Sequence, residues 1–391
     1  MGTGKITEKR TEEQRRAEAL ALLKHILDIP SVNGKDREQE TAVYLAEYLK
    51  RKGMETRVQL IDEHHGNVIG VLKGKTEETI LFNGHLDTVP YGDINEWNTN
   101  PAVCTEQDGR LYARGASDMK SGLAVMAFVL GELAESGCVP RKTIVFAGTC
   151  DEERGGLGAK EIIKEYPDLF PELLLIGEPT SCQAGVAQKG CIWLKLSVSG
   201  KTSHGAEPWQ GINALEQGFG LLADLREELK REEHPVLGHS TLQITMAEGG
   251  IAPNMTPDRA KFLADIRIVP PLNEKEVLNR LECLMQKRCE VYNGGLAFVP
   301  EITNYRMPVE TGPENQWLHR LKGFIGDDAG ETGINYFTDA SILLTAWPDS
   351  PALLFGPGEP QMCHKPNEYV EISKYFEAIR VMEKFCWYIA K

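Results

Sequence analysis

The chain has 391 residues, more than one hydrophobic core usually holds, so we expect two compact units. Hydrophobic residues make up 41% of the chain, which is typical of a globular protein that buries a core. The formal net charge of −14 repels phosphate backbones and anionic membrane surfaces, which argues against nucleic acid or membrane partners.

Two further features of the sequence concern its compartment. The longest apolar run, residues 123–130, is far shorter than the roughly 18 residues that span a bilayer, and the charged N-terminal segment does not resemble a secretory signal. The nine cysteines are irregularly spaced and contain no C-x-x-C, which argues against a disulfide framework and a zinc ribbon. We therefore expect a cytoplasmic enzyme.

The first half of the chain alternates between helical and extended patterns. The spacing of apolar residues predicts two opening helices over 12–27 and 38–52. Strands are then predicted at 68–72, 79–82, 143–147 and 173–176, and helices at 121–135 and 157–166. This alternation predicts an α/β fold whose central strands are covered on both faces.

From residue 190 the order of the predicted elements changes. Strands and helices follow one another as β-α-β-β-α-β, at 192–198, 213–230, 241–247, 260–269, 273–291 and 296–302. This is the order of a ferredoxin-like unit. We therefore predict a domain of residues 190–302, inserted into a discontinuous domain of residues 1–189 and 303–391. Helices at 316–325 and 373–389 and a strand at 352–355 complete the latter.

Acidic and imidazole groups follow the predicted strands of the first domain. The ligands of an open α/β sheet collect outside the carboxyl ends of its strands, so these groups should face one crevice. They are His85 and Asp87, then Glu152 and Glu153, then Glu178, and the crevice could be completed by Asp118 and His364.

Carboxylates at this density repel one another unless cations neutralise them. Mixed imidazole and carboxylate ligands suit two zinc ions, with cobalt or manganese as alternatives. Asp87 stands two residues after His85 in an extended segment, so its carboxylate could accept the second imidazole N–H. Of Glu152 and Glu153, one could bind metal while the other acts as a base, and their spacing leaves both assignments open.

Five segments, in this order, resemble the M20 metallopeptidase and deacylase family over nearly the whole chain: GHLDTVP, GASDMKSG, DEERGG, IGEPT and CHKPNE. The resemblance implies a zinc-exopeptidase-like catalytic domain with a central, mostly parallel sheet. It also implies two zinc ions bridged by Asp118, with Glu178 paired with His85 and Glu153 with His364. Glu152 would be the general base, and the peptide bond after Asp118 would be cis.

The resemblance extends to the inserted domain, which it implies to be a dimerisation and lid domain. His204 resembles a histidine that the partner subunit usually supplies to stabilise the oxyanion. Asn254 and Arg267 resemble positions that hold a substrate carboxylate, although Arg267 could equally form an ion pair within its strand. Because the resemblance places His204 in the site of the partner subunit, a homodimer through the inserted domain is expected. Gly356, in the other domain, is expected to line the pocket.

The function implied is hydrolysis of the amide bond of an N-acyl amino acid, as in acetylornithine deacetylase and succinyl-diaminopimelate desuccinylase. A di- or tripeptidase or a carboxypeptidase would use the same metals on a short peptide. A catalytically silent metal- or peptide-binding relative is the alternative from another class, and the presence of Glu152 argues against it. A two-metal phosphoesterase is disfavoured because the sequence has no phosphate cradle.

Overall fold

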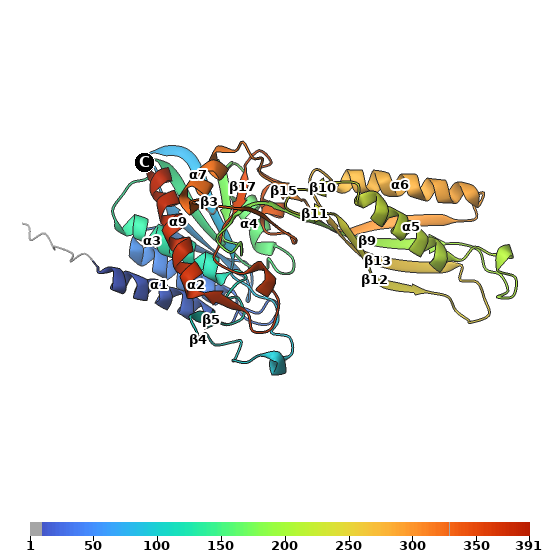
Figure 1. Ribbon diagram of the computed structural model, residues 1–391, viewed down its shortest axis with the longest axis horizontal. Helices are drawn as coiled ribbons and strands as arrows, with labels where there is room; N and C mark the ends of the chain where they lie inside the picture. The colour runs from blue at the N-terminus through green and yellow to red at the C-terminus, as the bar shows by residue number, and fades with distance from the viewer. Residues whose placement is uncertain (1–9, 328) are drawn as a thin grey trace, which may run out of the picture. The chain divides into compact units, whose positions relative to one another are not determined.

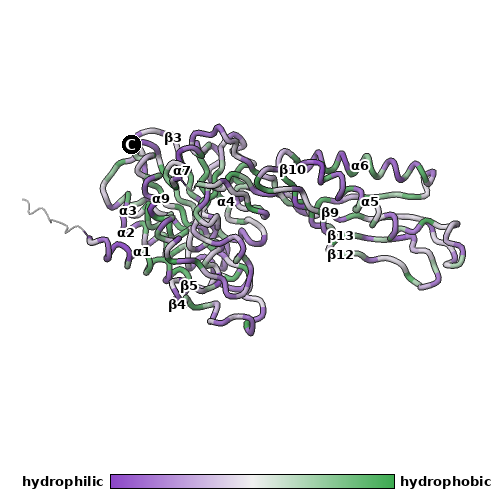
Figure 2. The backbone as a smooth tube through the Cα atoms, viewed as in Figure 1, coloured by the Kyte–Doolittle hydropathy of each residue, from purple (hydrophilic) through white to green (hydrophobic). Residues whose placement is uncertain are grey.

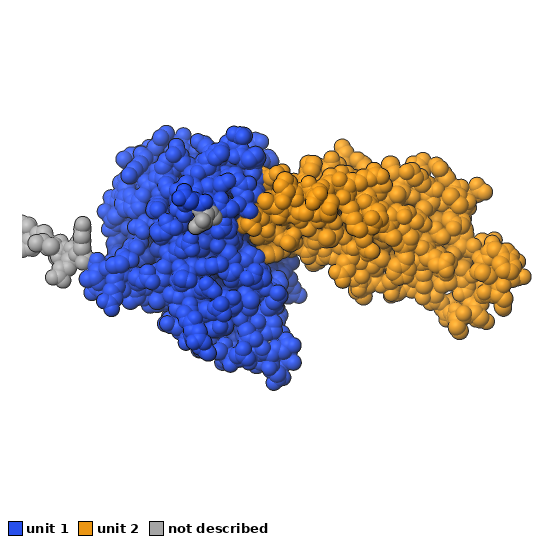
Figure 3. All heavy atoms as spheres, in the orientation of Figure 1, with its two compact units in different colours: residues 1–186, 311–331, 342–391 blue, residues 187–310, 332–341 orange. Residues whose placement is uncertain are grey.

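The structure is a computed structural model that describes residues 10–327 and 329–391 (Figure 1). It has two compact units: residues 187–310 and 332–341 form unit 2, and the other described residues form unit 1 (Figure 3). Unit 2 is therefore larger than the predicted insertion of residues 190–302, because it also contains residues 187–189, 303–310 and 332–341. Residues 1–9, where most of the segment compared with a secretory signal falls, lie outside the description.

Unit 1 is built on a mixed sheet. Its strands run in the order β1-β2-β6-β3-β7-β17-β8, and only the pairs among β6, β3, β7 and β17 are parallel. The expected mostly parallel sheet is thus parallel only at its centre, because β1, β2 and β8 pair antiparallel. The strands are β1 (Glu55–Leu60), β2 (Gly66–Leu72), β3 (Thr76–His85), β6 (Lys142–Thr149), β7 (Leu173–Ile176), β8 (Ala184–Gln188) and β17 (Ala352–Leu354).

Helices complete the core of unit 1. They are α1 (Glu12–Leu27), α2 (Gln39–Lys52), α3 (Lys120–Glu135), α4 (Leu157–Glu165), α7 (Gln316–Ile325), α8 (Ala340–Leu343, at the border of unit 2) and α9 (Ile372–Ala390). Helix α3 is buried along almost its whole length and packs against α9, α1 and α2, which explains why it is apolar on every side. Thr11 begins α1 with a capping box that Gln14 completes.

A small antiparallel sheet in unit 1 joins two distant segments. It contains β4 (Thr105–Gln107), β5 (Arg110–Tyr112) and β18 (Tyr369–Glu371), in the order β18-β5-β4. The backbone N–H of Ala113 continues the pairing by donating to Glu368 O over 3.2 Å. Residues that precede α3 therefore lie beside residues that precede α9.

Unit 2 has the predicted β-α-β-β-α-β order. Its elements are β9 (Gly190–Ser199), α5 (Ala214–Leu229), β12 (Thr241–Gly249), β13 (Arg259–Ile268), α6 (Glu274–Val291) and β14 (Ala297–Arg306). The sheet order β12-β13-β9-β14 is antiparallel throughout and is that of a ferredoxin-like unit. Both helices cover one face (Figure 1), and hydrophobic and hydrophilic residues alternate along α6 (Figure 2).

The remaining short elements had no clear sequence signal. They are the hairpin β10 (Glu233–His234) and β11 (Gly238–His239), the strands β15 (Val309–Glu310) and β16 (Glu331–Ile334), and the 3-10 helices η1 (Ile94–Glu96), η2 (Pro208–Gln210) and η3 (Pro360–Met362). Across residues 10–327 and 329–391, every helix is too short or too polar to cross a bilayer. No disulfide joins any of the nine cysteines, all of which are described.

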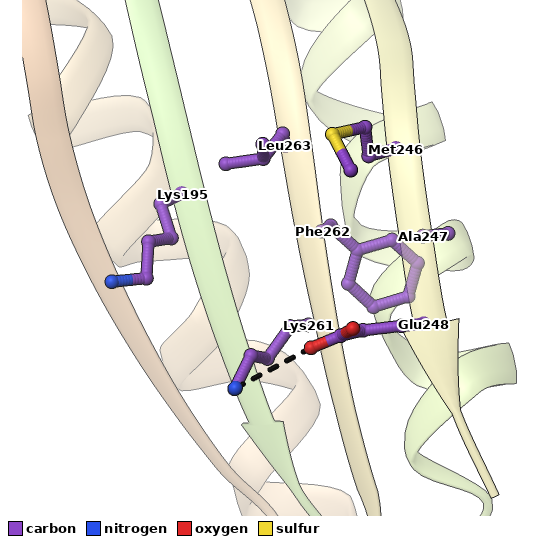
Figure 4. Close-up of a pocket in the computed structure, with 7 residues that line it drawn as sticks. All are labelled: Lys195, Met246, Ala247, Glu248, Lys261, Phe262 and Leu263. Carbon is purple, nitrogen blue, oxygen red and sulfur yellow. Dashed lines mark ion pairs between the residues drawn. The ribbon is translucent and has the colours of Figure 1, made fainter.

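A shallow pocket of about 290 Å³ lies on the face of the unit 2 sheet that the helices leave open (Figure 4). Its lining comes from β9, β12 and β13 and includes an ion pair between Lys261 and Glu248 at 3.3 Å. Among the residues that line it, Glu248 supplies the one carboxylate, and none is a histidine or cysteine. The lining of this pocket therefore differs from the predicted metal site, which combines several carboxylates with imidazoles.

Candidate metal centre

Five predicted ligands come together in unit 1, in two groups that share one residue. One group contains His85, Asp118 and Glu178, and the other contains Asp118, Glu153 and His364. Within each group the possible ligand atoms lie within 4.8 Å of one another. This pairs Glu178 with His85 and Glu153 with His364, which is the pairing that the resemblance implies.

Asp118 presents a different carboxylate oxygen to the histidine of each group. Its Oδ1 lies 3.1 Å from His85 Nε2, and its Oδ2 lies 3.5 Å from His364 Nε2. Glu178 Oε1 is 4.0 Å from His85 Nε2, and Glu153 Oε2 is 3.0 Å from His364 Nε2. The peptide bond between Asp118 and Met119 is cis, as the resemblance implied.

The electrostatics of the cluster fit a pair of cations. Burial and the charge of Asp118 raise the pKa of Glu153. Burial lowers the pKa of His85, but the hydrogen bond that its imidazole donates to Asp118 and the charges of Asp87 and Glu178 outweigh this effect and raise that pKa well above its usual value. Carboxylates and imidazoles crowded in this way favour divalent cations with mixed nitrogen and oxygen ligands. The donor set therefore fits the expected pair of metal ions.

Asp87 differs from the prediction in which of its oxygens meets the imidazole. His85 Nδ1 lies 2.9 Å from the backbone oxygen of Asp87 and 3.6 Å from the carboxylate. The Asp87 carboxylate instead accepts the backbone N–H groups of Glu152 and Glu153, each over 3.1 Å. Because side chains two residues apart in an extended segment lie on the same side, the sequence correctly predicted that His85 contacts Asp87. It predicted the wrong oxygen of Asp87, because the 151–153 loop folds back onto the carboxylate and donates its backbone N–H groups to it.

The 151–153 loop separates the two adjacent glutamates. Glu153 belongs to a candidate metal group, whereas Glu152, which is 7% exposed, belongs to neither. Asp151 has a left-handed backbone with φ of 61°. A Cβ at Gly155 would lie 2.5 Å from Asp151 Oδ2, so the chain returns close to the Asp151 side chain.

Glu368 is a supporting residue of the site that the sequence did not single out. Its fully buried carboxylate accepts the backbone N–H groups of Gly115, Ser117 and Asp118 over 3.1, 2.8 and 3.0 Å. Arg114 donates to it over 2.7 Å. Glu368 stands in the CHKPNE segment, so the motif marked its position, but only the fold reveals what it binds.

Gly356 lies beside a ligand strand of unit 1. A Cβ there would be 2.5 Å from Gly177 O and 2.6 Å from Glu178 O, so the backbone approaches the Glu178 segment too closely for any side chain. Its carbonyl accepts the N–H of Cys182 over 2.9 Å. These contacts give Gly356 a supporting role at Glu178, and its predicted contact with substrate stays a prediction.

The predicted residues of unit 2 fall at two ends of its sheet. His204 and Asn254 are exposed neighbours, because Gly205 N donates to Asn254 O over 2.7 Å. Arg267 is near the opposite end of β13 and pairs with Asp265, with Nε 2.7 Å from Oδ1 and Nη2 3.0 Å from Oδ2. The ion pair within the strand, one of the two readings of Arg267, is therefore present.

The chain is similar to known proteins over most of its length. The model of peptidase family M20/M25/M40 matches residues 81–388. Acetylornithine deacetylase of Shigella sonnei is 30% identical over 361 residues, which cover 88% of this chain and 90% of that protein.

Solved structures share the fold at lower sequence identity. Aminopeptidase PepT of Bacillus cereus has a TM-score of 0.76 at 19% identity, covering 96% of this chain and 99% of that chain. The YXEP protein of Bacillus subtilis, a dinuclear metal-binding peptidase of the M20 family, has a TM-score of 0.72 at 13% identity, covering 97% and 99%. Together with the family match and the two linked ligand groups, these similarities establish that the chain belongs to peptidase family M20/M25/M40 and is a hydrolase of that family.

Proposed function

We propose that the chain hydrolyses the amide bond of an N-acyl amino acid at two metal ions. The observation that carries this proposal is the pair of ligand groups sharing Asp118, with Glu152 next to one group and a member of neither. His85, Asp118 and Glu178 would hold one ion, and Asp118, Glu153 and His364 the other. The ligand set suits zinc, with cobalt and manganese as alternatives.

Metal ions bound there would polarise the scissile carbonyl and lower the pKa of water. The protein's own groups do the rest. The Glu152 carboxylate takes a proton from the attacking water and delivers it to the departing amine nitrogen. The Asp87 carboxylate accepts the backbone N–H of Glu152 and so fixes the backbone from which the Glu152 side chain extends. His204 would donate a hydrogen bond to the developing oxyanion.

The choice of an N-acyl amino acid rests on the 30% identity to acetylornithine deacetylase. A peptidase acting on di- or tripeptides is the second candidate, supported by structural neighbours that include an aminopeptidase and a dinuclear metal-binding peptidase. Those neighbours share less than 20% identity with this chain, so they support the fold alone, and the substrate has to be identified by an activity assay.

We also propose a homodimer in the cytoplasm, in which His204 acts on the partner's substrate. Arg267 is eight residues from Arg259 along β13, or about 27 Å, and Arg259 marks the end of the sheet near His204. One small substrate cannot touch both ends of one sheet, which supports a contribution from a second copy. Trp209 and Ile251, near His204 and Asn254, are 76% and 84% exposed and fit an interface. Asn254 lies at the His204 end of the sheet, so as carboxylate-binding residues Asn254 and Arg267 would contact one substrate from different copies.

A hydrolysis panel with one matched variant tests the function. N-acetylornithine, N-succinyl-diaminopimelate and dipeptides are supplied in turn with zinc, cobalt or manganese. Glu152→Gln should keep its metal and lose about 10²- to 10⁴-fold in turnover, because it removes a general base outside both ligand groups. Glu161→Gln, on the neighbouring helix α4, should be unaffected. Near-normal turnover in Glu152→Gln would overturn the mechanism, and a metal-loaded protein inert toward every amide would favour the silent relative.

A further inference from the structure

Glu38 is a buried carboxyl group behind the 151–153 loop. It precedes α2, is fully buried, and its Oε2 accepts the backbone N–H of Asp151 over 2.8 Å. The next two N–H groups of the loop, those of Glu152 and Glu153, are accepted by Asp87. Two buried carboxyl groups from distant parts of the chain therefore hold three successive amides.

The loop needs this support because of its conformation. Asp151 is a non-glycine residue with φ of 61°, a backbone region that L-residues adopt at a cost of about 1–3 kcal/mol. Asn33 adds a second link, because its Nδ2 lies 3.1 Å from Asp151 Oδ1 and 2.8 Å from Asp87 Oδ2. Asp151, the first residue of the loop, is thus hydrogen-bonded to the rest of unit 1 through its backbone and its side chain.

The charges around Glu38 favour its neutral form. Burial and the charge of Asp87 raise its pKa to about 9 and outweigh the hydrogen bond from the Asp151 amide, which lowers it; the charge of Asp151 also raises the pKa, while His85 lowers it. His65 Nε2 is 3.7 Å from Glu38 Oε1. Burial lowers the pKa of Lys120, and the charge of Glu38 is one of those that act against this lowering. A neutral carboxyl can accept the Asp151 amide without adding another negative charge beside the metal ligands.

We propose that Glu38 is a positioning residue for catalysis, which fixes the Asp151 amide and thereby orients Glu152 toward the substrate. The effect on turnover rests on the proposed function of Glu152, whereas the tether itself does not. What Glu38 must supply is an acceptor of the right length. Glutamine supplies one through its amide oxygen, whereas methionine fills the same volume without one.

Hydrogen–deuterium exchange of the metal-free protein tests the tether directly. In Glu38→Met the amides of residues 151–153 should exchange about tenfold or more faster than in the wild type, and Glu38→Gln should stay within about threefold. Glu38→Asp, which withdraws the acceptor by one methylene, should behave like Glu38→Met and serves if that variant fails to fold. Gln39→Met is the matched control, because this neighbouring buried side chain bonds Glu63 O instead. Unchanged exchange in both Glu38→Met and Glu38→Asp would overturn the tether.

Steady-state kinetics on the metal-loaded variants test the consequence. Glu38→Met should lower kcat by about 10- to 100-fold with KM within about threefold of the wild type, and Glu38→Gln should restore kcat. Wild-type kcat in Glu38→Met, or a loss in Glu38→Gln as large as in Glu38→Met, would overturn the positioning role. A wild-type protein that hydrolyses nothing would instead refute the proposed function, and the exchange experiment would still report on Glu38.

Discussion

Glu368 accepts the backbone N–H of Asp118 over 3.0 Å, so a buried carboxylate holds the residue that both candidate metal groups share. The same carboxylate pairs with Arg114 at 2.7 Å, and both side chains are almost completely excluded from solvent. Arg114 in turn donates to the backbone oxygens of Lys365 and Pro90, over 3.1 and 3.2 Å. The segments around Asp118 and His364 are thereby joined through one ion pair.

Glu368→Gln should weaken both folding and metal binding. It leaves the Arg114 charge buried without its counter-ion, which we expect to cost about 3–5 kcal/mol of unfolding free energy. Loosening of Asp118 should weaken metal binding by about 10- to 100-fold. Urea unfolding of the metal-free protein and a metal titration measure the two effects. The control is Glu371→Gln, which breaks the more exposed pair with Arg110 and should cost at most about 1 kcal/mol. Equal losses in the two variants would contradict the prediction.

Metal stoichiometry should reveal the shared ligand. His85→Ala and His364→Ala each remove a ligand from one group, so each should retain about one metal ion per chain. Asp118→Asn weakens both groups and should retain almost none. Elemental analysis after gel filtration measures the content, with His25→Ala, a histidine stacked on Tyr44, as the control that keeps both ions. Two tightly bound ions in Asp118→Asn would show that Asp118 does not bridge.

A mixed dimer tests whether His204 acts across subunits. His204→Ala and Glu152→Gln homodimers should both be nearly inactive. A heterodimer with one copy of each, purified through two tags, combines an intact Glu152 in one chain with an intact His204 in the other. It should recover about half of the wild-type activity, because one of its two sites is complete. An inactive heterodimer would place both residues in the same chain, and a fully active monomer in analytical ultracentrifugation would remove the dimer altogether.

The raised pKa of Glu38 predicts a pH-dependent stability. The folded protein keeps the Glu38 proton up to about pH 9, while the unfolded chain releases it near the ordinary value of 4.5. Within this window the folded state binds more protons, so raising the pH lowers the unfolding free energy. Glu38→Gln does not titrate. Its melting temperature relative to the wild type should therefore rise from pH 5 to pH 8 in the metal-free protein, and a difference independent of pH would contradict the prediction.

Periodicity predicted the regular elements well. The helices at 12–27 and 316–325 and the strand at 173–176 have the predicted bounds, because long amphipathic or buried runs give a strong local signal. The strand at 352–355 was also found as β17, whereas β1 and β8 and short strands such as β15 and β18 were missed, the last three because their pairing depends on distant partners. The assignment of residues 332–341 to unit 2 was missed for the same reason: Lys189 N bonds Ile334 O, a contact with no trace in the local sequence.

The candidate site shows a similar division. His85 ends β3, and Glu153 and Glu178 follow β6 and β7, so the rule about carboxyl ends of strands brought them together from sequence alone. Glu38 and Glu368 carry no such signal. A glutamate at the start of a helix usually faces water, and burial with a backbone amide as partner is decided by the tertiary fold.

The backbone amides held by Asp87 and Glu368 have a practical consequence for handling the protein. Because these hydrogen bonds within the polypeptide set the spacing of the loops that carry the metal ligands, removing the metal ions with a chelator should leave the arrangement of the ligands unchanged. One apoprotein preparation could then be reloaded with zinc, cobalt or manganese in turn. Differences in rate among the reconstituted forms would report the chemistry of each ion rather than incomplete refolding.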